Sequence, residues 1–145
     1  MSEKTAVDVL NELLEAERSG IVLFEQMSFL SMNREANRLF AVIRNNESRD
    51  CGLLHSLISR REVRPTDNMN GFADKVMAVE DEKERLELII KGCAWTARKI
   101  AEAFEYELTE EEQGFLIGMR NQHLWNIGML REFLKPAEER ELPSM

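Results

Sequence analysis

Hydrophobic residues recur at three- and four-residue steps along four long stretches of the chain, which is the spacing of one face of an α-helix. The pattern predicts four helices, over about residues 5–29, 34–62, 81–108 and 109–134. Only Ser31-Met32-Asn33 separates the first two, so they must be antiparallel neighbours. Thr109 and Glu112 have the spacing of a capping box, which starts the last helix. The sequence therefore predicts an all-α fold, a four-helix bundle.

Residues 63–80 form the longest connection in this arrangement. Arg64-Pro65 ends the second helix, because the residue before proline avoids helical backbone. Phe72 to Val79 can make about two helical turns at 1.5 Å per residue. A partly extended connection of this length can run beside a helix of about 42 Å. We therefore predict a long crossover between helices two and three, containing a short helix, instead of simple up-down topology.

A set of polar residues interrupts the apolar faces near the helix midpoints: Glu17, Glu47, Asp50, His123 and Asn126. Projection at about 100° per residue places each of them on a core face. Because the midpoints of antiparallel helices meet at one level, these side chains should form a single polar layer. Helix three supplies only Cys93 and, at the edge of its apolar face, Thr96.

Several carboxylates buried together are costly unless a cation compensates them. Carboxylates and an imidazole from facing helices suit iron, manganese or zinc, and bundle cores are where such sites are built. We therefore expect one metal ion held by Glu17, Glu47, Asp50 and His123.

The architecture resembles the ferritin-like superfamily over about residues 5–134. Three segments, LNELLEAER (10–18), GFADKVMA (71–78) and CAWTARKI (93–100), more narrowly resemble an uncharacterised bacterial ferritin-like family. The superfamily's di-iron pattern has a Glu on helices one and three and Glu-x-x-His on helices two and four. Glu17, Glu47 and His123 match this pattern.

Three positions depart from it. Asp50 stands where a histidine would be, and Arg120 replaces the glutamate of helix four. Glu102 lies opposite the apolar stripe of helix three, so it does not fill the remaining position. The resemblance therefore implies a degenerate motif that holds one metal, in place of a complete di-iron oxygenase or ferroxidase centre. If the protein is an enzyme, the resemblance implies a metal-dependent oxidoreductase.

Two other interpretations of the polar layer stay open. In the first, the layer holds no metal: His123 is protonated, Arg120 helps to neutralise the acids, and the protein has a structural or interaction role. In the second, the layer lines a pocket for a small ligand. Cys51 and His55, one turn apart, could also bind a metal, although this pair is more typical of plain packing.

Charge and composition limit the classes of partner, the location and the number of domains that the sequence predicts. The formal net charge of -8 excludes nucleic acid as the main partner, because a phosphate backbone requires surplus Lys and Arg. No apolar run is long enough for a membrane span, and no signal peptide is evident. The two cysteines lack a CxxC spacing, which favours reduced thiols and a cytoplasmic location. At 145 residues the chain fits one domain, with a polar tail over residues 135–145 that should fray.

Several large apolar residues project away from the predicted core faces: Leu23, Leu30, Trp95 and Trp125. Helix one is apolar on two sides in its second half, and a helix of this kind usually has a second partner. We therefore predict a homodimer that forms through these four residues.

Overall fold

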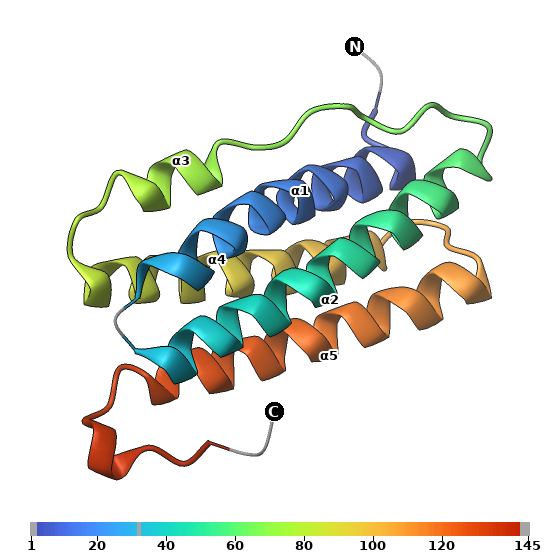
Figure 1. Ribbon diagram of the computed structural model, residues 1–145. Coiled ribbons are helices and arrows are strands. Elements are labelled where there is room, and N and C mark those ends of the chain that lie inside the picture. Colours follow the sequence, from blue (N-terminus) through green and yellow to red (C-terminus); the bar gives the residue numbers. More distant parts are fainter. Residues whose placement is uncertain (1–2, 32, 143–145) are drawn as a thin grey trace.

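Four long helices pack as a bundle in the computed structural model, which describes residues 3–31 and 33–142 (Figure 1). They are α1 (Ala6–Leu30), α2 (Arg34–Ser59), α4 (Glu82–Ala103) and α5 (Glu110–Glu132). The closest pairs are α1 with α2 and α4 with α5, and contacts of α1 with α4 and of α2 with α5 close the bundle. The predicted all-α four-helix bundle is confirmed. Met32, in the middle of the predicted first turn, lies outside the described residues.

The predicted long crossover is also confirmed. After α2 the chain runs back along the outside of α1, forms the short helix α3 (Phe72–Met77) and only then enters α4 (Figure 1). Consequently α2 and α4 run in the same direction, and α1 and α5 run in the opposite one. None of the helices in the described part of the chain is both long and apolar enough to cross a membrane.

Polar side chains of α1 hold the crossover in place. The Thr66 amide donates to Asn11 Oδ1 at 3.0 Å, and the Thr66 hydroxyl donates to Glu15 Oε2 at 2.7 Å. One turn further along α1, the buried hydroxyl of Ser19 accepts a hydrogen bond from the Ala73 amide at 2.9 Å. These bonds satisfy polar backbone groups of the crossover that would otherwise need water as a hydrogen-bond partner. They fix α3 over the second half of α1.

Two helices end earlier than the hydrophobic pattern predicts. α2 ends at Ser59 and continues as turns to Glu62, whose φ is 60°. α4 ends at Ala103, so Phe104 caps the helix and is exposed, although the predicted helix continued to about residue 108. The backbone there tightens into i→i+3 bonds, because the chain must turn before the extended N-cap of α5 at Thr109.

The tail also differs from its expected fraying. A short 3-10 helix, η1 (Ala137–Glu139), follows α5, and the Glu141 amide donates to Glu132 at 2.8 Å. Leu142 packs against the core. Residues 143–145, the end of the predicted tail, lie outside the described residues.

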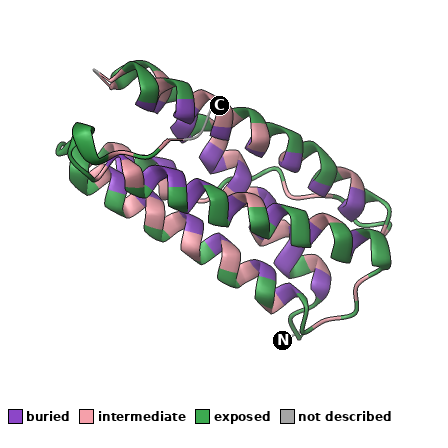
Figure 2. Ribbon diagram, turned by 90° about the horizontal axis from the view of Figure 1, so that it is seen from below, coloured by how far each residue is buried: buried purple, intermediate pink, exposed green. Residues whose placement is uncertain are grey.

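The buried residues lie along the inward faces of the helices (Figure 2) and form two apolar clusters. One cluster gathers around Phe24 and Phe40, whose ring centroids are 6.1 Å apart. The other is built largely of leucines near the start of α1 and the end of α2. Buried polar residues lie between these clusters along α1 and α2, as the predicted polar layer requires.

Leu23 contradicts its expected place on an outward surface, because it is fully buried. It belongs to the same cluster as Ala73 and Val76 of α3. The second partner of this half of α1 is therefore the chain's own crossover helix. Leu30, Trp95 and Trp125 are exposed, and the homodimer stays a prediction.

A buried ion pair links the end of α2 to the start of α5. Arg61 binds both carboxylate oxygens of Glu112 at 2.7 Å and donates to the Glu107 carbonyl at 3.0 Å. Glu112 is buried, and the guanidinium lowers its pKa. Next to this pair, Arg60 and Glu111 form an exposed ion pair.

We predict that Arg61→Met lowers the free energy of unfolding by about 2 kcal/mol, because it leaves Glu112 buried without its cation. The matched change Arg60→Met should cost less than about 0.5 kcal/mol, because its partner stays in water. Urea unfolding followed by circular dichroism measures both values. Equal losses in the two variants would contradict the assignment of Arg61–Glu112 as the stabilising pair.

Candidate metal centre

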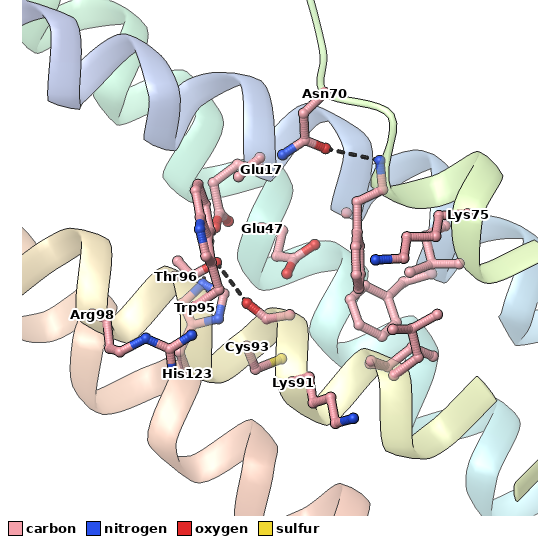
Figure 3. Close-up of a pocket in the computed structure, with 18 residues that line it drawn as sticks. Glu17, Glu47, Asn70, Lys75, Lys91, Cys93, Trp95, Thr96, Arg98 and His123 are labelled. Atoms are coloured by element: carbon pink, nitrogen blue, oxygen red, sulfur yellow. Dashed lines mark hydrogen bonds and ion pairs between the residues drawn. The ribbon is translucent and has the colours of Figure 1, made fainter. Parts of the chain in front are cut away.

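Three side chains from three helices converge in the polar layer: Glu17 of α1, Glu47 of α2 and His123 of α5 (Figure 3). One ligand-type atom from each lies within 4.8 Å of the other two. Their relative exposures are 1%, 4% and 2%, so all three are withdrawn from solvent. His123 Nε2 is 2.9 Å from Glu17 Oε1. The structure therefore brings together, in one group, three of the residues that the sequence predicted at a common level.

Each member of the group keeps an atom without a hydrogen-bond partner among the described residues. These atoms are Glu17 Oε2, Glu47 Oε2 and His123 Nδ1. An unsatisfied buried polar atom costs about 1–3 kcal/mol, and more when it is charged. Two oxygens aimed into a buried group that also contains an imidazole are the donor set that a divalent transition metal takes. The chemistry of these three side chains is thus suited to bind a metal ion.

The helix positions of the three residues depend on a close approach of α1 and α2. A Cβ atom placed on Gly20 would lie 2.0 Å from Glu47 Oε2 and 2.7 Å from its Cδ. The Glu47 carboxyl group is therefore packed directly on the backbone of α1, where only glycine leaves room. Our sequence reasoning missed Gly20. The available signal was a glycine inside a helix, where it is unfavourable by about 1 kcal/mol, three residues after Glu17.

Burial governs the charge of the group. It raises the pKa of Glu47 well above its ordinary value, and the nearby Glu17 carboxylate raises it further. Burial alone would lower the pKa of His123, but the Glu17 carboxylate and the Cys93 thiol beside it hold that pKa well above its usual range. The shifts favour the protonated form of Glu47 and the charged form of His123 in the metal-free protein.

Asp50 is buried in the same layer but does not join the group of three. Its Oδ1 is 3.9 Å from Arg49 Nε, and its Oδ2 has no partner among the described residues. Asn126 accepts a hydrogen bond from Gln122 at 3.2 Å and also lies outside the group. These two positions extend the polar layer without converging on the imidazole.

The remaining sequence candidates lie elsewhere. Arg120 is exposed and makes no ion pair within residues 3–31 and 33–142, which contradicts its expected role in neutralising the acids. Thr96 is buried and not at the edge, with its hydroxyl bonded to the Gly92 carbonyl at 3.1 Å. Cys51 is half-buried, His55 is exposed, and neither joins the described ligand group.

A cavity of about 330 Å³ reaches the group from the outside. Its walls come from α1, from α4 and from the crossover with α3 (Figure 3). Glu17, Glu47 and His123 all contribute to its lining. The ligand-type side chains are thus buried but can be approached by a small molecule.

A family model described as "Domain of unknown function (DUF6306)" matches residues 4–131. The chain belongs to the DUF6306 family. A search of curated proteins gave no match. The DUF6306 chain is similar in fold to a ferritin-like, diiron-carboxylate protein from Bacillus anthracis strain Ames, with a TM-score of 0.73 and 17% sequence identity. That similarity covers 90% of this chain and 95% of the other, and it confirms the ferritin-like architecture.

Asp50 makes the stability of this DUF6306 protein depend on pH. Burial, with a smaller contribution from the Glu17 charge, raises the pKa of Asp50 from 3.8 to about 6 in the folded protein. The folded state then binds the proton more tightly than the unfolded state, so stability falls as the pH rises from about 4 to about 6.

We predict that Asp50→Asn stabilises the metal-free protein by about 2 kcal/mol at pH 7 and that the gain disappears below about pH 4. Asp74→Asn, which changes an exposed aspartate on α3, should shift stability by less than about 0.5 kcal/mol at either pH. Urea titrations at pH 4, 5, 6 and 7 would measure the difference. A stabilisation that does not vary with pH would argue against a buried, titrating Asp50.

Proposed function

We propose that this protein binds one transition-metal ion in the bundle core, through Glu17, Glu47 and His123. The observation that carries the proposal is the meeting of three buried ligand-type atoms from three helices within 4.8 Å, with carboxylate oxygens that lack partners among the described residues. Similarity to a protein whose name describes a diiron-carboxylate centre supports it. Asp50, also expected as a ligand, is placed outside the coordinating set because it does not join the group.

The proposed site holds one ion because α4 offers no carboxylate at this level. Glu102 of α4 instead binds Lys4 at 2.9 Å and Lys99 at 2.8 Å on the surface. Cys93 and Thr96 are among the α4 residues that line the cavity. Two carboxylates and one imidazole suit iron, manganese or zinc. A bound iron or manganese ion would supply redox chemistry, and zinc would supply Lewis-acid chemistry.

The chain's own residues would prepare the site for an ion and a small reactant. Glu47 is held by the backbone at Gly20, so its carboxyl group has little freedom to turn away. The Glu17–His123 bond of 2.9 Å orients the imidazole toward the same point. Three protein ligands leave coordination positions free for water or a reactant, which is the arrangement of catalytic metal sites. The cavity would give a reactant access to those positions.

A metal-free structural role is the second candidate, and the short Glu17–His123 ion pair favours it. In that case the imidazolium compensates one carboxylate and protonation compensates Glu47. Arg49 is the basic side chain nearest Asp50, at 3.9 Å. Metal analysis separates the two candidates.

We predict about one metal equivalent per chain after purification without chelator or after loading with Fe²⁺, Mn²⁺ or Zn²⁺. Glu47→Ala should lose this metal, because it removes an anionic ligand. Asp50→Asn should keep it, because Asp50 lies outside the group. Inductively coupled plasma mass spectrometry gives the stoichiometry, and circular dichroism verifies that each variant is folded. Less than about one tenth of an equivalent after loading with all three metals would refute the proposal.

Metal binding should also release protons. In the metal-free protein the pKa values of Glu47 and His123 are raised, which favours the protonated form of both groups. A metal must displace these protons, so its affinity should rise with pH and each bound ion should release a measurable number of protons. Calorimetric titration in two buffers of different ionisation enthalpy measures this number. Binding without proton release would place the ion somewhere other than Glu47 and His123.

A further inference from the structure

The cavity beside the proposed metal site has an unusual distribution of charge. Three basic residues line it: Lys75 of α3 and Lys91 and Arg98 of α4. The acidic residues in its lining are the two buried carboxylates of the metal group, Glu17 and Glu47. The whole chain has a net charge of -8, so a wall with an excess of exposed cations runs against the general composition.

These cations are not used by the fold. None of the three forms an ion pair within the described parts of the chain, whereas Lys99, next to Arg98, binds Glu12 at 2.6 Å and Glu102 at 2.8 Å. In Figure 3 the ammonium group of Lys75 points from α3 toward Glu47. An unpaired Lys or Arg beside a low-dielectric wall attracts anions and repels divalent cations. The cavity is therefore better suited to bind an anionic reactant than to admit a metal ion.

Apolar side chains form a large part of the remaining wall. They are Leu23, Phe24, Phe72, Leu88, Ile89 and Trp95. A volume of about 330 Å³ and a mixed apolar and polar lining are usual for a small-molecule site. A ligand that fits this wall needs an apolar body as well as an acidic group.

Two helix-interior glycines allow side chains in the cavity lining to pack directly on the helix backbone. A Cβ atom on Gly92 would lie 2.4 Å from Phe72 Cζ, so the phenyl ring of α3 lies directly on the backbone of α4. Gly20 makes the equivalent approach to Glu47 on the opposite side. Both glycines line the cavity, and an added Cβ at any of the other five glycines would meet nothing within 4 Å in the described structure. The two helix-weakening residues that the packing requires are thus both in this pocket.

We propose that this cavity binds a small organic anion with an apolar body, a carboxylate or a phosphate ester. Its acidic group is attracted by the positive charge that Lys75, Lys91 and Arg98 give to the wall, and its apolar body lies along Phe72, Ile89 and Trp95. The bound molecule is held next to Glu17, Glu47 and His123. As the substrate class of the metal site, this assignment rests on the proposed function, but the binding itself needs no metal.

The test uses three probes with the same apolar body: octanoate, octyl phosphate and the neutral octan-1-ol. Calorimetry on chelator-treated and on zinc-loaded full-length protein should give one binding site for at least one of the two anions. Octanol should bind at least about tenfold more weakly than that anion, because it lacks the charge-assisted hydrogen bonds. Of the two anions, the tighter one identifies the acidic group.

Charge variants locate the site. The triple change Lys75→Gln, Lys91→Gln and Arg98→Gln should weaken anion binding at least about tenfold and leave metal stoichiometry unchanged. The matched triple change Lys83→Gln, Arg120→Gln and Arg131→Gln removes three exposed cations away from the cavity lining and should leave both unchanged. Quenching of Trp95 fluorescence in a Trp125→Phe background gives a second reading from inside the pocket.

The outcomes separate this proposal from the metal proposal. Anion binding without metal uptake would support the pocket and refute the metal site. Three results would overturn the anion assignment alone, each observed together with metal uptake. They are the absence of anion binding, binding of octanol as tight as that of the anions, and equal losses of anion binding in the two triple variants.

Discussion

The carboxyl group of Glu47, buried between two apolar clusters, is the constraint on which the rest of the structure depends. It lies on the backbone of α1 at Gly20, beside the Glu17–His123 pair, so α1, α2 and α5 must meet at one height and with fixed rotations. A buried acid without compensation would oppose folding. Protonation of Glu47 offsets this in the metal-free protein, and the proposed metal ion would offset it more fully.

The sequence was sufficient to predict the bundle, the crossover and the height of the polar layer, because helical periodicity and helix midpoints are local properties. The sequence was not sufficient to show which of several residues on one helix face would converge on the site or be covered by another helix. Asp50 lies one turn from Glu47 but does not converge on His123, and Leu23 is covered by α3, although it appeared free on a helical projection. Both outcomes depend on small rotations of packed helices and on where the crossover lies, and neither has a local signal.

The crossover has a larger role than joining α2 to α4. Hydrogen bonds that Glu15 and Ser19 accept from crossover residues fix it along α1. The crossover therefore places Phe72 and Lys75 of α3 opposite α4, where they form the outer wall of the cavity. The sequence did contain one indication of such a wall: glycines at positions 20 and 92, each inside a helix where glycine is unfavourable.

The α4 helix supplies no carboxylate to the ligand group and instead lines the cavity beside it. In the di-iron pattern that the sequence resembles, helix three would supply a glutamate at this level. Here α4 presents Gly92, Cys93 and Thr96 instead, and all three line the cavity. A glutamate there would fill part of that volume and place a negative charge among the cations of the wall. The absence of an α4 carboxylate and the positive charge of the cavity wall both support the proposal of one metal ion beside an organic anion.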